Sequence, residues 1–338
     1  MRNIVLIDEF HETDFKPSEV FSMYLKLAEQ DIRAFFPSTT LAVCPCPACG
    51  STQSKPQFQK FGLQYMVCDE CDTLYVSPRP EDAAILNYYQ KSKAEDYWRN
   101  ELAKNTATQR RNKILRPRLQ WILDSTQEYC PGAQSIADVY TNQPGYIEGL
   151  SDLSEFKEKW LIHPMLSEEV CENYAGIQVI QTPFTKLDWN EKVDVISAFE
   201  VVDLSSDPSL FFSKLHEALK PGGLCFLTTI LASGFDLQIL WEHARNVFPP
   251  TRLNLFSDAG LLKCAQKFGF ECIEFSTPGI LDLEIIDKAT KDSPQIPIPR
   301  FLSYLLKHRD VHVQQAFQEF LQSSRLSSYG RVLLRKSV

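Results

Sequence analysis

The chain has 338 residues, of which 44% are apolar and 23% are charged, and its formal net charge is −8. This length exceeds that of one small domain, so we expect roughly two domains. The acidic balance argues against a protein whose main task is to hold a nucleic-acid backbone, because such proteins usually carry a strongly basic face.

The sequence predicts neither a membrane span nor an export signal. No stretch approaches the roughly 18 consecutive apolar residues that cross a bilayer. The start, MRNIVLIDEFHETDF, carries acidic residues where a signal peptide would have an uninterrupted apolar core. We therefore expect a cytoplasmic protein.

The first 127 residues are predicted to hold three segments. Residues 1–40 form an N-terminal helical segment, because apolar side chains recur at helical spacing over 18–36 behind Ser18, a candidate N-cap. Residues 41–80 contain the short β-type runs QYMVC and TLYVS and end at SPRP, where two prolines stop regular structure. Residues 81–127 are polar and aromatic without glycine, which predicts a helical linker.

Residues 128–338 are predicted to form an α/β domain. Short β-branched runs alternate with helical segments, which is typical of a mostly parallel sheet covered on both faces. A proline-rich loop and helices are expected as an insertion at about 283–328, before a final edge strand. The predicted strands are residues 135–140, 159–163, 177–181, 193–199, 223–230, 270–277 and 330–336.

Four cysteines predict a structural zinc site. Five of the ten cysteines lie between positions 44 and 71, and in a chain without an export signal such crowding indicates metal rather than disulfides. Two C-x-x-C knuckles can complete a tetrahedral thiolate site, which has no open position for activating water. Cys44 is a fifth thiol that we expect outside this site. The predicted ligands are Cys46, Cys49, Cys68 and Cys71.

The segment VDVISAFEVVDLSSDPSLFFSKLHEALKPGGLCFLTT resembles the class I S-adenosylmethionine (SAM) dependent methyltransferases, in which LKPGG is a characteristic turn. Together with CPACG, CDECDTLYVSPRP, PPTRLNLFS and TPGILD, it is similar to a zinc-ribbon-bearing group associated with bacterial sugar and surface-polysaccharide biosynthesis. The resemblance implies a Rossmann-like seven-stranded sheet with an antiparallel last strand. It also implies SAM as cofactor and a sugar-type small molecule or glycan as substrate.

The resemblance assigns a cofactor site whose residues depart from the family pattern. The family has a glycine-rich loop after the first strand, because SAM passes close to the backbone there. This chain has YTNQPGY instead, in which Tyr140 replaces a glycine and Gly145 is retained. His163 stands where the family uses an acid for the ribose hydroxyls, and it cannot replace a bidentate acceptor. Asp138 and Glu200 complete the predicted cofactor contacts.

Candidates for a proton-abstracting base are Asp203, His163 and Glu200, which the resemblance places on the substrate side. Leu204 replaces a histidine that the family often has. Arg252 replaces another histidine, and it could bind a phosphate of a nucleotide-linked sugar or form a salt bridge.

Two functions follow from this pattern. The first is a SAM-dependent methyltransferase that acts on a nucleotide-linked or polymer-linked sugar. The second is a catalytically inactive homologue that serves as a binding or scaffold partner of a biosynthetic enzyme, because the departures gather where ligand or substrate would lie. A third class, RNA modification, is disfavoured by the acidic balance.

Overall fold

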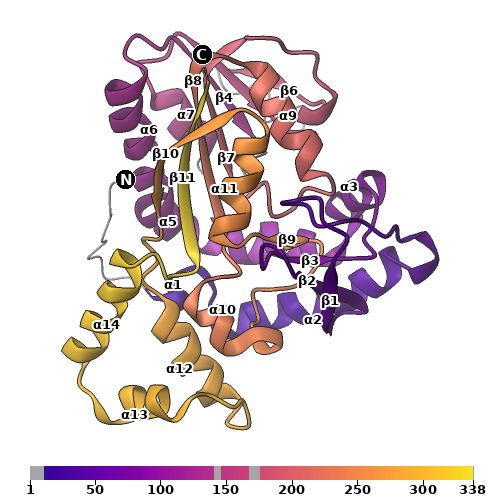
Figure 1. Cartoon of the computed structure of the whole chain (residues 1–338), viewed down its shortest axis with the longest axis vertical. Helices are drawn as coiled ribbons and strands as arrows, with labels where there is room; N and C mark the ends of the chain where they lie inside the picture. Colours follow the sequence, from indigo (N-terminus) through magenta and orange to yellow (C-terminus); the bar gives the residue numbers. More distant parts are fainter. Residues whose placement is uncertain (1–10, 141–145, 167–175, 338) are drawn as a thin grey trace.

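The computed structural model describes residues 11–140, 146–166 and 176–337 (Figure 1). Two β-sheets organise this part of the chain, one of seven strands and one of four. The large sheet occupies the upper part of Figure 1, and the small sheet lies near the lower end of the large sheet. Within the described residues, no helix is both long and apolar enough to cross a membrane.

The large sheet has the strand order β10-β11-β8-β7-β4-β5-β6. Strand β11 runs antiparallel to both of its neighbours, whereas the pairs from β8 to β6 are parallel. The predicted α/β class, with a mostly parallel seven-stranded sheet and an antiparallel last strand, is confirmed. The strands are β4 (Ser135–Val139), β5 (Glu158–Ile162), β6 (Gln178–Ile180), β7 (Val193–Phe199), β8 (Leu219–Ile230), β10 (Phe270–Ser276) and β11 (Tyr329–Lys336).

The last strand does not lie at the edge of the sheet, and this part of the prediction was wrong. Strand β11 pairs with β8 on one side and with β10 on the other. Val332 and Leu334 pack on one face of the sheet, and Leu333 packs on the opposite face. The consecutive apolar residues of this strand reflect an interior position, because both faces of an interior strand are covered.

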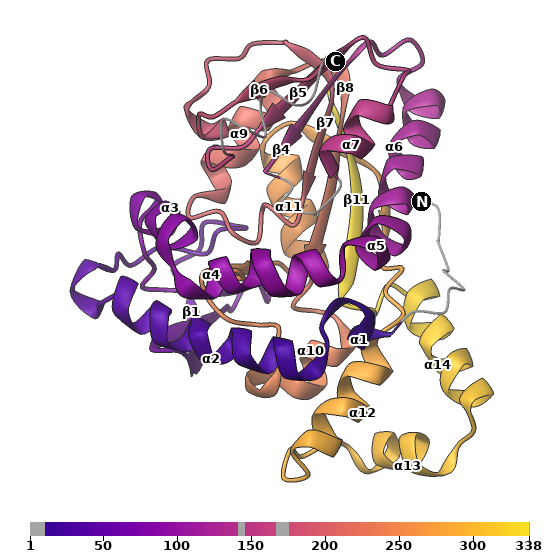
Figure 2. The ribbon, with the colours of Figure 1, turned by 180° about the vertical axis from the view of Figure 1, so that it is seen from behind.

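Helices cover the two faces of the large sheet. Helices α6 (Arg116–Tyr129) and α7 (Tyr146–Asp152) pack on one face, as Figure 2 shows. Helices α9 (Pro208–Ala218) and α11 (Asp258–Lys267) pack on the other. Asp207 begins α9 as an N-cap, since its side chain accepts a hydrogen bond from the N–H of the third helical residue.

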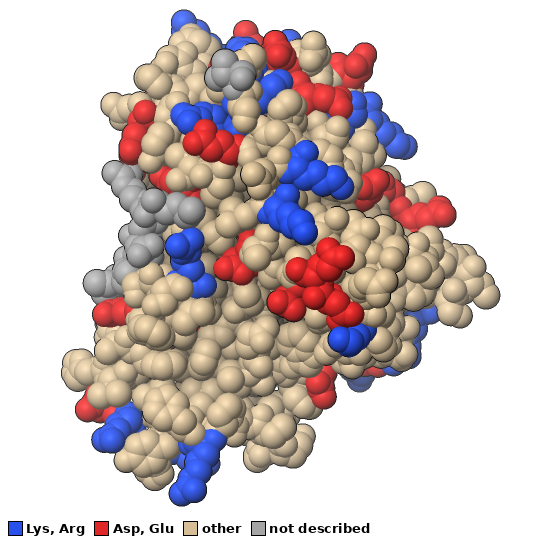
Figure 3. Space-filling model, viewed as in Figure 1, with Lys and Arg blue, Asp and Glu red and all other residues tan. Residues whose placement is uncertain are grey.

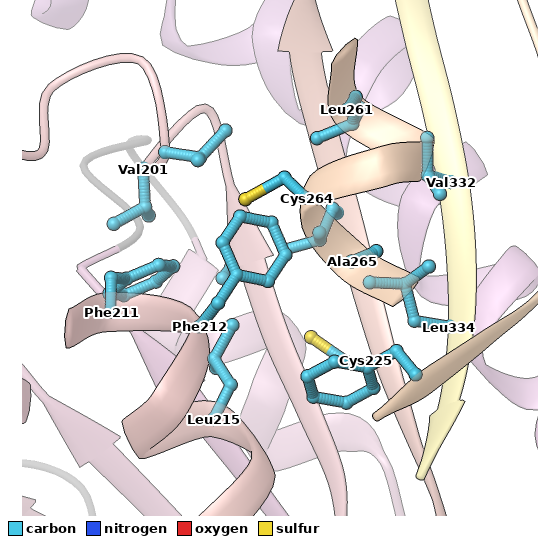
Figure 4. Close-up of a cluster of buried hydrophobic side chains, with 14 of the residues drawn as sticks. Val201, Phe211, Phe212, Leu215, Cys225, Leu261, Cys264, Ala265, Val332 and Leu334 are labelled. Atoms are coloured by element: carbon cyan, nitrogen blue, oxygen red, sulfur yellow. The ribbon is translucent and has the colours of Figure 1, made fainter. Parts of the chain in front are cut away.

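Figure 4 shows the core between α9, α11 and the sheet, where Phe212 and Cys264 lie above the strand residue Cys225. Cys225 and Cys264 are buried free thiols, as the sequence predicts for cysteines outside the metal site. Cys130 and Cys272 are free and half-buried. Cys171 lies outside the described residues.

The N-terminal part and the stretch between the two sheets are helical. The predicted N-cap Ser18 is instead the first residue of its helix, and Pro17 precedes it without a side-chain capping bond. Two π-helical segments, Trp98–Ala103 and Arg111–Leu115, interrupt the linking stretch. The remaining helices here are α1 (Glu12–Phe15), α2 (Ser18–Phe35), α3 (Asp82–Lys91), α4 (Lys93–Tyr97) and α5 (Ala107–Arg110), with a 3-10 turn at Ser38–Thr40.

The small sheet combines three strands of the cysteine-rich segment with one strand from far along the chain. Its order is β1-β2-β3-β9, and β3 pairs with β9 antiparallel, with Leu74 opposite Leu255. The cysteine-rich segment is therefore joined to the later sequence by backbone hydrogen bonds. The strands are β1 (Ser54–Lys60), β2 (Leu63–Cys68), β3 (Leu74–Val76) and β9 (Asn254–Leu255).

Helices occupy the predicted insertion before the last strand. They are α12 (Asp282–Asp292), α13 (Arg300–His308) and α14 (Val311–Ser323), which lie at the bottom of Figure 1. Helix α10 (Phe235–Leu240) contacts α12. On the face shown in Figure 3, acidic and basic side chains are interspersed, so that face carries no continuous field of one sign.

Candidate functional site

The four predicted zinc ligands come together in the structure. Their sulfur atoms all lie within 4.8 Å of one another. The Sγ atoms of Cys46 and Cys71 are 3.6 Å apart, and those of Cys49 and Cys68 are 3.5 Å apart. A tetrahedral zinc ion with Zn–S bonds of about 2.3 Å separates its sulfurs by about 3.8 Å. The four cysteines therefore fit a zinc ion, and the ligand set leaves no position open for chemistry.

Both knuckles are built by tight turns. Gly50 and Asp72 have positive φ angles of 80° and 54°, and each follows the second cysteine of its knuckle. Their N–H groups donate to the carbonyls of Cys46 and Cys68 at 2.9 and 3.0 Å. Cys44 does not join the cluster, since its Sγ lies 3.7 Å from the carbonyl oxygen of Val76. The turns thus bring four of the five crowded thiols to one point.

The cysteine cluster is attached directly to helix α11. The Ser257 hydroxyl donates to the carbonyl of Cys71 and accepts the N–H of Gly260 at 2.8 Å. A side chain at Gly260 would collide with Thr73, whose hydroxyl lies 3.3 Å from the Cys71 sulfur. The cysteine cluster is therefore joined to a helix that packs on the large sheet.

Three predicted site residues follow neighbouring strands of the large sheet. Glu200 comes directly after β7, Tyr140 after β4 and His163 after β5, and these strands are adjacent in the order β7-β4-β5. Because these strands are parallel, the three residues lie along one edge. Tyr140 and Glu200 both have φ angles of 61°, in the left-handed region that only glycine adopts readily.

Asp138 is directed into the sheet. It is fully buried near the end of β4, and its Oδ2 accepts a hydrogen bond from the Ser197 hydroxyl of β7 at 2.7 Å. The Tyr146 hydroxyl lies 3.0 Å from the same Ser197 oxygen. This carboxylate therefore serves a buried hydrogen-bonding network between β4, β7 and α7.

The Tyr140 side chain crosses the edge of the sheet toward the segment after β6. Its hydroxyl oxygen accepts the backbone N–H of Phe184 at 3.0 Å, at the start of the 3-10 turn Phe184–Lys186. Its ring meets the His163 ring edge-on, with centroids 6.3 Å apart. Burial raises the pKa of Tyr140 to about 12, so the hydroxyl is neutral. The side chain is thus held at both its ring and its hydroxyl.

His163 is buried, and it forms hydrogen bonds within the protein. The ring Nδ1 of His163 accepts the backbone N–H of Met165 at 3.3 Å, and the backbone N–H of His163 donates to the carbonyl of Ile180 at 2.9 Å. Burial lowers the pKa of His163 to about 4, so the ring is neutral at physiological pH. A neutral ring with one nitrogen already bonded cannot receive both hydroxyls of a ribose.

These contacts do not fit SAM in the manner of the family. A glycine-rich loop after the first strand is replaced at its first position by the Tyr140 side chain, and the ribose acid is replaced by His163. Gly145, the retained glycine, lies outside the described residues. Among the described residues, the Tyr140 side chain stands at the first glycine position after β4, and His163 rather than a carboxylate follows β5.

Glu200 forms ion pairs with two arginines. Its Oε1 accepts from Arg118 Nη2 at 2.7 Å, and its Oε2 accepts from Arg252 Nη2 at 3.1 Å. Burial opposes ionisation of this carboxyl, but the two guanidinium charges outweigh it and lower the pKa of Glu200 to about 2. Such a strongly held carboxylate is a poor proton acceptor at neutral pH.

Asp203 is fully buried and lies beside Arg252, the arginine that also pairs with Glu200. Its Oδ2 lies 3.4 Å from Arg252 Nη1, and its carboxylate accepts hydrogen bonds from the Thr229 hydroxyl and the Ile230 N–H. Burial raises its pKa to about 6, against the opposing charge of Arg252. Arg252 thus forms salt bridges, one of the two roles that the sequence left open.

Two cavities adjoin at Glu200. The smaller, of about 160 Å³, is lined by Tyr140, Leu204 and aromatic side chains such as Trp98. The larger, of about 280 Å³, lies on the side of Arg118. Both share the lining residues Lys16, Trp98, Glu200, Asn246 and Arg252.

Sequence reasoning missed the basic residues of this region. Arg118 lies in the predicted helical linker, and Lys16 follows a four-residue helix. Arg331 lies within the last strand, where an arginine beside consecutive apolar residues could have indicated a buried charge. None of these residues belongs to a short motif, so only the folded chain brings them together.

The strand order and the helices on both faces define an α/β protein of the class I methyltransferase type. A family described as "Methyltransferase domain" matches residues 76–274, more than half of the chain. The chain belongs to this family. A search of curated proteins found no match.

Solved structures with a similar fold share little sequence with the chain. A SAM-dependent methyltransferase from Thermotoga maritima is 14% identical with a TM-score of 0.40, covering 68% of this chain and 94% of that one. The YcgJ protein from Bacillus subtilis is 11% identical with a TM-score of 0.42, covering 66% of this chain and 99% of that one. These similarities concern the fold alone.

Proposed function

We propose that this chain is a non-catalytic member of the methyltransferase family that acts by binding, as a partner of a biosynthetic enzyme in the cytoplasm. The position of Tyr140 carries the proposal. Its side chain spans from the end of β4 to the Phe184 N–H, across the edge at which the family binds its cofactor. A ligand with an adenosine group would have to displace this side chain and break that hydrogen bond.

Two neighbouring residues support the same conclusion. His163 is neutral and already accepts a backbone N–H, so it offers no carboxylate to a ribose. Asp138 is fully buried and accepts the Ser197 hydroxyl within the sheet. Each residue has a structural role here, while the turns and the core of the fold are retained.

The zinc centre and its sheet give this binding protein a rigid surface. Strand β1 lies at an outer edge of the small sheet, since its order is β1-β2-β3-β9. A sugar-type ligand or a protein is the kind of partner that we propose, in the context of surface-polysaccharide biosynthesis. This context rests on the sequence resemblance.

Calorimetric titration of the purified protein with SAM and with S-adenosylhomocysteine tests the proposal. We expect no heat of binding at millimolar ligand, because Tyr140 spans the edge of the sheet and His163 offers no carboxylate to the ribose. Micromolar binding of either compound would show that the cofactor site functions. The zinc-loaded protein is the sample for both titrations.

The second candidate is a SAM-dependent methyltransferase that acts on a nucleotide-linked or polymer-linked sugar. Asp203 favours it, because a buried carboxyl with a pKa of about 6 could accept a proton near neutral pH. Asp203 is joined through Arg252 to Glu200, which lines both cavities. The same titrations decide between the two candidates.

A further inference from the structure

We propose that the larger cavity binds the phosphate group of a small-molecule ligand, with Arg331 and Arg118 as its main contacts. This inference goes beyond the proposed function and does not depend on whether SAM binds. The cavity has a volume of about 280 Å³ and is lined by seven basic and three acidic side chains. The basic ones are Lys16, Arg110, Lys113, Arg118, Arg245, Arg252 and Arg331, and the acidic ones are Glu200, Asp236 and Asp282.

Arg331 is a buried cation that forms no ion pair within 4 Å with any described residue, although the Glu274 carboxylate attracts it from further away. It is 6% exposed, and its Nε has no hydrogen-bond partner. The guanidinium carbon lies 4.2 Å from the centroid of the Trp121 ring. Glu274, the nearby acid, instead accepts the indole N–H of Trp121 at 2.8 Å. A buried guanidinium is costly unless it is paired and hydrogen-bonded, so this position favours an anion from outside.

Arg118 adds a second guanidinium on the same side of the cavity. Its Nε donates to the Tyr329 hydroxyl at 3.1 Å, and its Nη2 donates to Glu200 at 2.7 Å. Its Nη1 donates to none of the described residues. Burial lowers the pKa of Arg331 and the charge of Arg118 lowers it further, whereas Tyr329 and Glu274 act in the opposite direction. An anion bound between the two cations would offset their repulsion.

Several other basic residues of the cavity have acidic partners within the chain. Lys113 pairs with Asp14 at 3.3 Å, and Arg245 pairs with Asp292 at 3.3 Å. Arg331, by contrast, is buried, forms no ion pair with a described residue, and has an Nε without a hydrogen-bond partner. This difference selects Arg331 as the anchor of the proposed site.

A phosphate group matches the donors that face the cavity. A guanidinium presents N–H groups in a planar fork that binds two phosphate oxygens at once. The volume lies near the lower end of the range for small-molecule pockets, about 300–1,000 Å³, which suits a small molecule. The adjoining smaller cavity, lined by rings such as Tyr24, Trp98 and Phe248, can receive an apolar or ring-shaped portion of the same ligand.

Calorimetry with inorganic pyrophosphate at constant ionic strength tests the site. We expect the wild-type protein to bind, and Arg331→Met to lower the affinity by at least about tenfold. Arg335→Gln is the matched control, because Arg335 lies on the same strand but pairs at the surface with Glu271 at 2.6 Å. This control should bind within about twofold of the wild type, since exposed ion pairs contribute little.

A second variant keeps the test decisive if Arg331→Met does not fold. Arg331→Lys retains the charge without the planar fork, and we expect its affinity to fall between those of the wild type and Arg331→Met. Inorganic phosphate and UDP-glucose, titrated alongside, distinguish a free phosphate from a phosphate of a larger molecule. Wild-type protein that binds none of the three probes would overturn the proposal, as would Arg331 variants that bind pyrophosphate like the wild type.

Discussion

Arg118 Nη2 donates a hydrogen bond to Glu200 Oε1 over 2.7 Å, and this contact ties helix α6 to the carboxyl end of strand β7. The two residues are 82 positions apart in the sequence. Arg252 holds the other oxygen of the same carboxylate. One carboxylate thus balances two largely buried guanidinium groups beside both cavities.

Replacing Glu200 by Gln should therefore destabilise the protein. The substitution leaves Arg118 and Arg252 without their shared counter-charge, and we expect a loss of about 2 kcal/mol in the free energy of unfolding, because an unpaired buried charge is costly. Urea denaturation measures this loss. Glu271→Gln, which breaks an exposed pair with Arg335, is the control and should cost at most about 1 kcal/mol. Equal effects of the two substitutions would contradict the buried role of Glu200.

The cysteine cluster predicts about one zinc ion per chain. Cys68→Ser should lose the metal and lower the free energy of unfolding by about 4 kcal/mol or more, since loss of a structural metal is among the most damaging single changes. Elemental analysis and urea denaturation measure the two effects. Cys44→Ser provides a matched control, because Cys44 lies outside the cluster, and it should retain the metal. A folded wild-type protein without zinc would refute the assignment.

Stability should fall between pH 6 and pH 8 because of Asp236. Burial and the neighbouring Asp282 raise the pKa of Asp236 to about 8, far above its value in the unfolded chain. Between these two pKa values the folded state binds a proton that the unfolded state does not, so stability decreases as the pH rises. We expect about 2 kcal/mol less stability from this group at pH 8 than at pH 6.

Asp236→Asn should remove that part of the pH dependence. Urea denaturation at both pH values compares the variant with the wild type and with Asp124→Asn, an exposed control. The control should keep the wild-type difference between the two pH values. An Asp236→Asn variant with an unchanged pH dependence would show that Asp236 ionises normally.

Restoring two family features should create affinity for SAM. Tyr140→Gly removes the side chain at a backbone position whose φ of 61° suits glycine, and His163→Asp restores the acid after β5. We expect the double variant to bind S-adenosylhomocysteine with a Kd below about 1 mM, whereas the wild type does not bind. Tyr140→Phe, which keeps the ring, should remain without affinity. Failure of the double variant to bind would show that other residues also close the site.

Local patterns of the sequence predicted the elements that local physics controls. The runs VDVISAF and GLCFLTTI indicated strands because β-branched and apolar residues suit a buried parallel sheet, and both are strands in the structure. The C-x-x-C spacing indicated the metal centre because two thiols of one turn can reach the same ion. Strand β9 was missed, because its two residues form a strand only through pairing with β3.

The sequence by itself determined the α/β class, the seven strands and the four clustered thiols, since these follow from periodicity and short spacings. Only the tertiary structure decided what faces the edge of the sheet. The Tyr140 hydroxyl accepts a hydrogen bond from Phe184, which is 44 positions away in the sequence. The indole N–H of Trp121, whose ring lies beside Arg331, donates to the carboxylate of Glu274, which is 153 positions away. Such contacts depend on how distant segments pack, so no local pattern encodes them.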